Sequence, residues 1–267
     1  MVLGWDWQEV RGVGFWRVSF LEAVGRGVGC GAVFSSRHGG ASAGPYRSLN
    51  LGAAVGDDPE RVECNRRCFA FAAGFRVEAC VRVRQVHGSV AVEVRTPGLG
   101  GAADAMVTAE RGLVLSVGTA DCVPVYLLDP ERGVIGLCHA GWRGTVADVT
   151  ASALRAMRDI WGCSTGRIWA AIGPSIGPCC YEVDTPVIDA VQANLPWSAD
   201  VLGRRSTGHA YLDLWEANRQ SLVAAGVDPD QVSIARICTS CAEKLLFSHR
   251  RDAGKTGRME AALWMEV

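Results

Sequence analysis

The sequence lacks an excess of charge of either sign. Its 267 residues include 27 Lys and Arg against 28 Asp and Glu, which gives a net charge of −1 and a pI of about 6.5. Nucleic acids and anionic membrane surfaces attract proteins through basic patches or a strong positive balance. The composition therefore gives no electrostatic basis for either partner, although Arg-rich spots such as SHRRD stay candidates for binding small anions.

Segments that would direct the chain to or across a membrane are also missing. The N-terminus, MVLGWDWQEV, carries acidic residues and has no basic start followed by an apolar stretch, so no signal peptide is expected. The apolar stretch GLVLSVGTA ends at Asp121 and is too short to span a bilayer. Eleven cysteines, without the spacing of a small secreted scaffold, favour a reducing cytoplasm in which most thiols are buried.

No repeat period and no low-complexity linker divides the chain. With 49% hydrophobic residues, its 267 residues are enough to bury a large core. Segments with strand and helix patterns are mixed without a strict βαβ rhythm. We therefore expect an α+β fold of layered mixed β-sheets flanked by helices, in a single domain over residues 1–267.

Local patterns predict where several elements lie. A helix is expected in DDPERVECNRRCFAFAAG, with an Asp cap, Pro59 in the first turn and Gly74 at its end. Another is expected from Thr145 to Trp161, because apolar residues recur there at helical spacing up to Gly162. Two further helices are expected, one that begins at DTP and one in LWEANRQSLVAAG. Strands are expected at GVGCGAVFSS, VRVRQV, VAVEV, IWAAI and VSIAR.

Two apolar runs, CVPVYLL and VIGLCH, flank the turn sequence DPERG. In an antiparallel hairpin centred on the Pro-Glu of that turn, Cys122 lies opposite His139, with Cβ atoms about 4.5–5.5 Å apart. The pair could bind one metal ion or form a thiolate–imidazolium pair, with Asp121 as a hydrogen-bonding neighbour. Each residue alone is more often structural, the cysteine as a small buried hydrophobe. Pro124 cannot donate to a ladder, so its strand is expected at a sheet edge or with a bulge.

Six motifs in register along the chain resemble those of the laccase-domain family: RQVHGSV, ADAMVT, TADCVPVYLLD, GLCHAGWRGT, IGPSIGPCCYEV and FSHRRDAGKTGR. The stretch SSRHGGASAGPYRSLNLGAAVGDDPERVECNR is similar to the family's N-terminal signature, and the similarity runs from about Gly31 to Trp264. This family was formerly labelled multicopper polyphenol oxidase and is now described as zinc-dependent purine nucleoside phosphorylases. The resemblance therefore implies an enzyme whose partners are purine nucleosides and phosphate.

The resemblance implies a metal site formed by His87 in QVHG, Cys122 in TADC and His139 in HAGWRG. Imidazole and thiolate are preferred zinc ligands, and three protein ligands leave a fourth position for water or substrate. Copper oxidation is not expected, because blue-copper and trinuclear centres need many imidazoles, usually in His-x-His pairs. The chain has five His and no such pair. The cofactor that the resemblance implies is zinc.

The chemistry implied by the resemblance is phosphorolysis of adenosine, inosine and guanosine, together with adenosine deamination and methylthioadenosine cleavage. Deamination follows from an open zinc, which lowers the pKa of its water to roughly 7. Phosphorolysis also needs an anion cradle, which the planar fork of arginine suits, although a lone arginine is more often only solvated. We expect catalysis by Asp121, Cys122 and His139, with Asp121 orienting a ligand or carrying a proton. The substrate-binding candidates are His38, Arg47, Asn50, Arg143 and Arg250, with Arg251 as an alternative to Arg250.

The remaining cysteine pairs carry weaker signals. CTSC, at residues 238–241, has two-residue spacing but no second pair at zinc-finger distance and no thioredoxin-like context. The adjacent Cys179 and Cys180 lie in a motif shared with the family and are expected to pack near the pocket. His249 and Asp184 stand where the family commonly has Tyr and Gly, so the base or sugar preference is a property in which this chain can differ from the family.

Two other functions fit the same residues. A cysteine hydrolase or deamidase, including one that edits cell-wall precursors, would use Cys122 as a nucleophile activated by His139. A binding or assembly protein would carry a structural zinc. Loss of nucleoside turnover on chelation favours the zinc enzyme, and activity that survives chelation but is lost with iodoacetamide favours the hydrolase. A metal with no exchangeable ligand position favours the binding or assembly protein.

Overall fold

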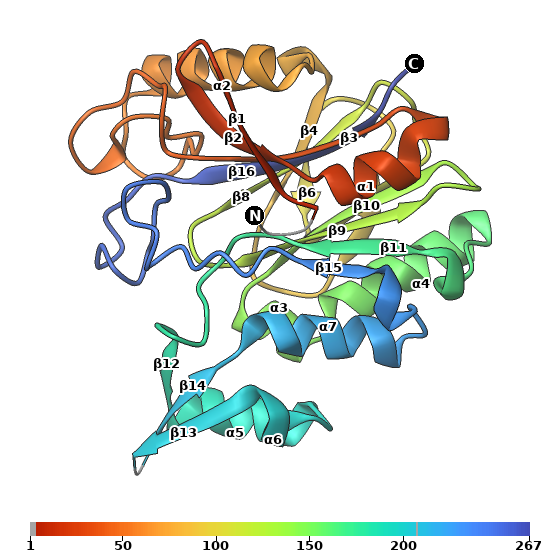
Figure 1. Cartoon of the computed structure of the whole chain (residues 1–267), viewed down its shortest axis with the longest axis vertical. Coiled ribbons are helices and arrows are strands. Elements are labelled where there is room, and N and C mark those ends of the chain that lie inside the picture. Colours follow the sequence, from red (N-terminus) through yellow and green to blue (C-terminus); the bar gives the residue numbers. More distant parts are fainter. Residues whose placement is uncertain (1–3, 207) are drawn as a thin grey trace.

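Two β-sheets pack face to face in the computed structural model, which describes residues 4–206 and 208–267 (Figure 1). The first sheet contains, in spatial order, β1 (Asp6–Val10), β2 (Val13–Arg17), β3 (Cys30–Ser35), β16 (Met259–Met265), β8 (Val114–Thr119), β4 (Cys80–Arg84) and β6 (Gly98–Ala102). The second contains β15 (Val232–Ile234), β11 (Trp169–Ile172), β9 (Val123–Asp129), β10 (Val134–Ala140), β7 (Ala105–Thr108) and β5 (Ala91–Glu93). Both sheets mix parallel and antiparallel pairs, which confirms the predicted α+β class.

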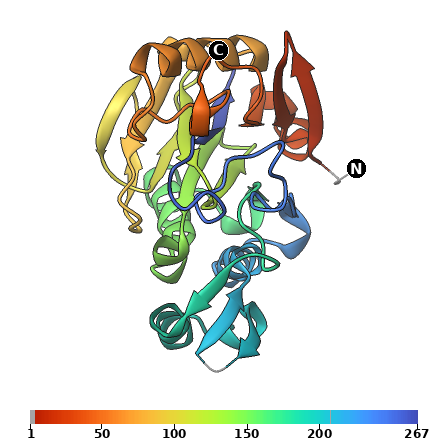
Figure 2. The ribbon, with the colours of Figure 1, turned by 90° about the vertical axis from the view of Figure 1, so that its left-hand side faces the viewer.

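Helices cover the outer faces of both sheets, and a smaller sheet lies at one end of the molecule (Figures 1 and 2). The helices are α1 (Ser19–Val24), α2 (Pro59–Ala73), α3 (Trp142–Val146), α4 (Val149–Trp161), α5 (Thr185–Asn194), α6 (Ser198–Val201) and α7 (Leu214–Ala224). Short 3-10 turns lie at Gly25–Val28, Gly44–Tyr46, Val77–Ala79, Thr165–Arg167 and Pro229–Gln231. The small sheet has the order β12 (Glu182–Asp184), β14 (His209–Leu212), β13 (Leu202–Ser206) and lies beside α5 and α6.

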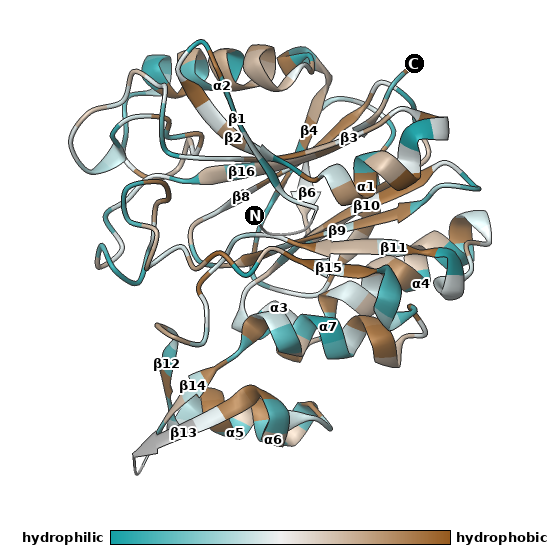
Figure 3. Ribbon diagram, in the orientation of Figure 1, coloured by the Kyte–Doolittle hydropathy of each residue, from teal (hydrophilic) through white to brown (hydrophobic). Residues whose placement is uncertain are grey.

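The core is divided among the layers because the strands are buried on both faces. Successive residues of a strand point to opposite faces, so Leu127 packs toward α4 while Leu128 packs between the sheets. Strands of this kind read as continuous apolar runs rather than alternating ones, as VPVYLLD does, and Figure 3 shows them largely brown. The layer between α2 and the first sheet contains Phe15, Val33 and Phe69. That the chain forms a single domain stays a prediction.

The helix predicted after Asp58 is confirmed as α2. The Asp58 side chain accepts a hydrogen bond from the Glu60 backbone N–H, and Pro59 occupies the first turn. Gly74 ends the helix in the left-handed region, at φ 88°, where a residue with a side chain is strained. In the described part of the chain, no helix has both the length and the apolar character needed to cross a membrane.

The single helix predicted from Thr145 to Trp161 is wrong, because the structure has two helices there. The chain breaks between α3 and α4 at Asp148, which adopts a left-handed φ of 56°. The Asp148 carboxylate accepts a hydrogen bond from the Ala151 N–H and caps α4. Apolar spacing did not reveal this break, because it records the face of a helix and not where the helix begins.

The predicted hairpin exists, but its predicted register is wrong by two residues. Strands β9 and β10 are antiparallel and pair Pro124 with His139, so Cys122 lies one step beyond the end of β9. A shift of two keeps a residue on the same face of the sheet, since side chains alternate with period two. Cys122 is therefore a diagonal neighbour of His139 and still faces the same side, within reach of long side chains.

The expectation that Pro124 places its strand at an edge or bulge is also wrong, because β9 lies inside the sheet between β10 and β11. The His139 N–H donates to the Asp104 carbonyl on the other side of β10, at 2.7 Å, so it does not pair with Pro124. The last residue of β11 paired with β9 is Ile172, which lies opposite Val125. The next residue, Gly173, donates its N–H to the Pro124 carbonyl at 2.9 Å, so Pro124 lies at the end of that ladder and its missing N–H removes only the last hydrogen bond.

Candidate metal centre and its cavity

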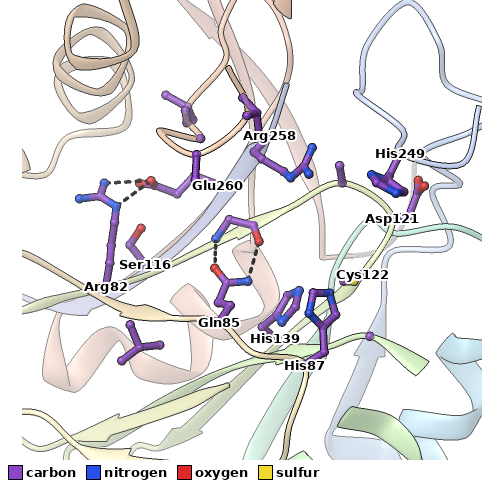
Figure 4. Close-up of a pocket in the computed structure, with 18 of the residues that line it drawn as sticks. Arg82, Gln85, His87, Ser116, Asp121, Cys122, His139, His249, Arg258 and Glu260 are labelled. Atoms are coloured by element: carbon purple, nitrogen blue, oxygen red, sulfur yellow. Dashed lines mark hydrogen bonds and ion pairs between the residues drawn. The ribbon is translucent and has the colours of Figure 1, made fainter. Parts of the chain in front are cut away.

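Three chain connections that pass from one sheet to the other carry the polar residues of the site. His87 lies between β4 and β5, Asp104 between β6 and β7, and Cys122 between β8 and β9. His139 comes from β10, in the second sheet. These segments bring together residues that are far apart in the sequence, as Figure 4 shows for His87, Cys122 and His139. Rigid strands thus position the side chains of short loops.

The predicted ligand set is brought together. One ligand atom each from His87, Cys122 and His139 lies within 4.8 Å of the others. The two imidazole rings meet edge to face, with centroids 4.9 Å apart and an angle of 77° between their planes. His139 is buried, Cys122 is half-buried and His87 is exposed. The set therefore opens toward solvent on the side of His87.

A buried carboxylate that sequence reasoning missed holds two parts of this set. Asp104 is fully buried, and its oxygens accept hydrogen bonds from the backbone N–H groups of residues 86–88, at 2.7–3.2 Å. Its Oδ1 also lies 2.9 Å from Nδ1 of His139. The bond to Nδ1 leaves Nε2 of His139 for a ligand, as in the carboxylate–histidine pairs of metal sites. The available signal was an acidic residue directly before the apolar run AMV.

Two residues of the site have strained backbones. His87 has a φ of 59° and Asp121 a φ of 87°, in the left-handed region that residues with side chains rarely adopt. The turn at His87 is held by the bonds to Asp104, and the turn at Asp121 by bonds to residues of distant loops. Such strain persists only where the surroundings fix the backbone, and it gathers at functional sites.

The charges of the site favour a thiolate beside an imidazolium. Burial alone would raise the pKa of Cys122, but the charge of His139 and hydrogen bonds to His139 and His87 outweigh it and lower the pKa to about 6. Burial would likewise lower the pKa of His139, but the charge of Cys122 and the hydrogen bond to Asp104 raise it to about 9. Burial would raise the pKa of Asp104, but its bonds to His139 and to the backbone lower it. Near neutral pH the proton therefore stays on the imidazole.

The donor atoms fit a thiophilic divalent metal. Two imidazoles and one thiolate are the ligand types of catalytic zinc sites, which use three protein ligands and keep one position open. All three residues line one cavity, so that position would face it. Four other cysteines, Cys179, Cys180, Cys238 and Cys241, form a second group that shares no residue with this triad.

The cavity has a volume of about 780 Å³, which is in the range that holds small molecules. Six arginines line it together with the triad, among them Arg143, Arg250 and Arg258. The guanidinium of Arg143 stacks over Trp142 at 4.3 Å, and that of Arg250 lies over Tyr181 at 5.0 Å. These arrangements hold cationic groups beside the triad.

The far wall of the cavity carries a second set of polar groups. Arg82 and Glu260 form an ion pair with atoms 2.9 Å apart, and Gln85 bonds both ways with the backbone of Gly118 (Figure 4). The Ser116 hydroxyl is buried and has no hydrogen-bond partner among the described residues. A buried polar atom without a partner is a candidate for contacting a ligand, because such atoms are normally satisfied.

Six of the predicted site residues line this cavity and three do not. Those that line it are His87, Asp121, Cys122, His139, Arg143 and Arg250. His38, Arg47 and Asn50 are absent from its lining. Asn50 is buried, donates to Gly52 and Asp57, and accepts from the Arg258 N–H, so it holds its loop together. His38 and Arg47 are exposed on the same loop.

Asp121 and Arg251 have roles in holding loops. The Asp121 carboxylate accepts bonds of 2.6 Å from the Thr239 hydroxyl and the Arg250 N–H, and the imidazole is instead bonded by Asp104. Arg251 is absent from the cavity lining, and its guanidinium donates to the backbone carbonyls of Thr239 and Leu246 and pairs with Asp252. The predicted alternative of Arg251 as a substrate ligand therefore has no support from its contacts.

The chain is similar to known proteins over most of its length. A family model described as multi-copper polyphenol oxidoreductase laccase matches residues 31–266. Purine nucleoside phosphorylase YlmD of Geobacillus stearothermophilus is 42% identical over 244 residues, which are 87% of this chain and 89% of that protein. Adenosine deaminase RL5, from an unknown prokaryotic organism, is 36% identical over 225 residues, 80% of this chain and 85% of that one. The crystal structure of YlmD from Geobacillus stearothermophilus matches with a TM-score of 0.89 at 39% identity, over 97% of this chain and 98% of that chain.

Proposed function

The chain belongs to the multi-copper polyphenol oxidoreductase laccase family, and from this premise we propose that it is a zinc-dependent purine nucleoside phosphorylase acting on adenosine, inosine and guanosine. The observation that carries the proposal is the meeting of His87, Cys122 and His139 in one cavity that arginines also line. The name of the relative YlmD supports the same activity. We also propose a cytoplasmic location, because the eleven cysteines favour a reducing compartment.

Phosphorolysis transfers the ribose from a base to phosphate. The bond from C1′ to the base nitrogen breaks, a bond from C1′ to a phosphate oxygen forms, and the base leaves with a proton. The developing charge on the sugar and base must be stabilised, and the phosphate must be held on the opposite side of C1′ from the base. Each of these needs corresponds to a group that lines the cavity.

The arginines suit the phosphate. Arg143 comes four residues after His139, and the Arg250 backbone N–H bonds Asp121 beside Cys122. Both arginines line the cavity, where their planar guanidinium groups can grip anionic oxygens in pairs. The stacking on Trp142 and Tyr181 limits the rotation of both side chains, so less entropy is lost when an anion binds. We assign phosphate binding to these two arginines and to Arg258.

The far wall suits the nucleoside. The Ser116 hydroxyl has no partner in the described part of the chain, and Glu260 is held by Arg82 within the cavity wall. These polar groups would orient the base or the ribose hydroxyls. Zinc, if bound by His87, Cys122 and His139, would supply a Lewis acid or an activated water. Asp104 keeps the His139 ring in the orientation that a ligand needs.

The test is a product analysis with metal control. Purified protein is incubated with adenosine, with and without phosphate, and the products are separated by chromatography. We expect adenine and ribose 1-phosphate only when phosphate is present, loss of turnover with a chelator, and recovery on adding zinc. Turnover unchanged by chelation, or by Cys122→Ala in folded protein, would contradict the proposal.

Two specific observations favour other reactions at the same site. The relative named adenosine deaminase RL5 favours deamination, which would give inosine without phosphate in the same experiment. The low pKa of Cys122, about 6, favours a cysteine hydrolase or deamidase with His139 as its partner. That enzyme would keep its activity after chelation and lose it with iodoacetamide.

A further inference from the structure

Four cysteines meet at a second place in the fold, away from the triad. Cys179 and Cys180 lie on the loop between β11 and β12, and Cys238 and Cys241 lie on the loop after β15. Their sulfurs all lie within 4.8 Å of one another. The Cys241 sulfur is 3.6 Å from that of Cys179 and 3.4 Å from that of Cys180. The two pairs are far apart in the sequence, and no local pattern connects them.

The separations are those expected around a tetrahedral ion. Zinc–sulfur bonds of about 2.3 Å place sulfurs at the corners of a tetrahedron roughly 3.8 Å apart. The measured 3.4 and 3.6 Å are close to that edge, and the outer limit of 4.8 Å leaves little adjustment for the other pairs. Small rotations of the side chains would bring the four sulfurs around one ion.

Packing does not account for the cluster. Cysteine in a core behaves as a small buried hydrophobe, but Cys179 and Cys241 are exposed and only Cys238 is buried. The Cys238 sulfur also accepts a hydrogen bond from the Gly177 backbone N–H, at 3.3 Å. A backbone N–H directed at sulfur stabilises a thiolate, which is the form that binds metals.

We propose that Cys179, Cys180, Cys238 and Cys241 bind a second zinc ion in a closed site with four thiolate ligands. Two ligands come from each of two loops, and the spacing of residues 238–241 is that of a zinc-binding Cys-x-x-Cys pair. A site with four protein ligands has no position for substrate, so its role is structural. The proposal does not depend on the nucleoside activity.

The ion would fix one wall of the cavity. Cys180 precedes Tyr181, which lines the cavity beneath Arg250. Thr239, inside the Cys-x-x-Cys segment, donates to Asp121 next to the triad, at 2.6 Å. Joining the two loops through a metal would therefore hold both contacts in place, since a structural zinc adds its binding free energy to folding.

Zinc content of purified variants tests the proposal. The protein is reduced, loaded with zinc, freed of excess metal by gel filtration and analysed for zinc per chain. We expect about two zinc ions in the unchanged protein, about one in Cys241→Ser and about one in Cys122→Ser. Cys64→Ser, at an exposed cysteine of α2, is the matched control and keeps the content of the unchanged protein.

The two variants separate the two proposed sites. If Cys241→Ser keeps the zinc content of the unchanged protein, the second site is contradicted, whatever Cys122→Ser does. If only Cys122→Ser keeps its content, the triad assignment fails and the second site stands. Alkylation of the unchanged protein, mapped by mass spectrometry, is the measurement that needs no variant: zinc is expected to protect all four cysteines at least tenfold. Equal alkylation with and without zinc, or a disulfide among the four in reduced and zinc-loaded protein, would overturn the proposal.

Discussion

A single buried carboxylate illustrates how much one residue decides in this protein. Asp104 holds the left-handed turn at His87 through backbone N–H groups and bonds the ring of His139. Two of the three proposed metal ligands thus share one positioning residue. Both oxygens of a buried carboxylate need hydrogen-bond partners. Asp104, the turn at His87 and the ring of His139 therefore depend on one another.

Replacing Asp104 by Asn is expected to weaken zinc binding at the triad by about 10–100-fold, because the amide is a weaker acceptor from the imidazole and presents an N–H to the backbone donors. The measurement is competition with a chelator of known zinc affinity, with circular dichroism to show that the variant folds. Asp159→Asn, at an exposed residue of α4, is the control with unchanged affinity. Equal affinities would show that Asp104 does not position His139 for metal.

The pKa of Cys122 predicts an unusual pH profile for the metal-free protein. With a pKa of about 6, its thiolate is lost only as the pH falls through 6, whereas an ordinary thiol loses its thiolate below about 8.5. Alkylation of Cys122 by iodoacetamide is therefore expected to be half-maximal near pH 6 and close to its maximum at pH 7.5. A half-maximal rate near pH 8.5, followed by mass spectrometry of the Cys122 peptide, would show that His139 does not stabilise the thiolate.

At the scale of secondary-structure elements, capping residues and turns set where helices begin and end, which apolar patterns do not show. The helix after Asp58 was predicted correctly because its cap, its proline and its closing glycine are all visible in the sequence. The break at Asp148 was missed because the aspartate that caps α4 stands inside a continuous apolar pattern. A cap can therefore start a new helix without interrupting the spacing of core residues.

Asp148→Ala is expected to lower the free energy of unfolding by about 1–2 kcal/mol, because it removes the cap of α4 and keeps a side chain at a left-handed φ. Asp148→Gly also removes the cap but relieves the backbone, so its loss should be only a few tenths of a kcal/mol. Urea unfolding measures both. Asp159→Ala, an exposed change on the same helix, should stay within about 0.5 kcal/mol. A Gly variant as unstable as the Ala variant would argue against strain at this position.

At the scale of the whole molecule, the site exists because the chain repeatedly passes between the two sheets at one end. The connections β4–β5, β6–β7 and β8–β9 each leave the first sheet and enter the second. They bring His87, Asp104 and Cys122 to the same end of the core, beside His139. The cavity lies between these connections and the last part of the chain, which supplies Arg250 and Arg258.

The sequence by itself determined the α+β class, the longer helices and several of the strands, the family, and the three residues proposed as metal ligands. These follow from local patterns and motifs, which consist of residues close together in the sequence. The register of the β9–β10 hairpin was wrong because the turn sequence allows more than one loop length, and the slip of two kept Cys122 on the correct face.

Only the tertiary structure decided which distant residues share a site. It placed Asp104 rather than Asp121 against His139, kept His38, Arg47 and Asn50 out of the cavity lining, and joined Cys179 and Cys180 to the Cys-x-x-Cys pair. The physical reason is that these contacts depend on the pairing order of strands and on the packing of two sheets, which are set by interactions between segments and leave no local pattern in the chain.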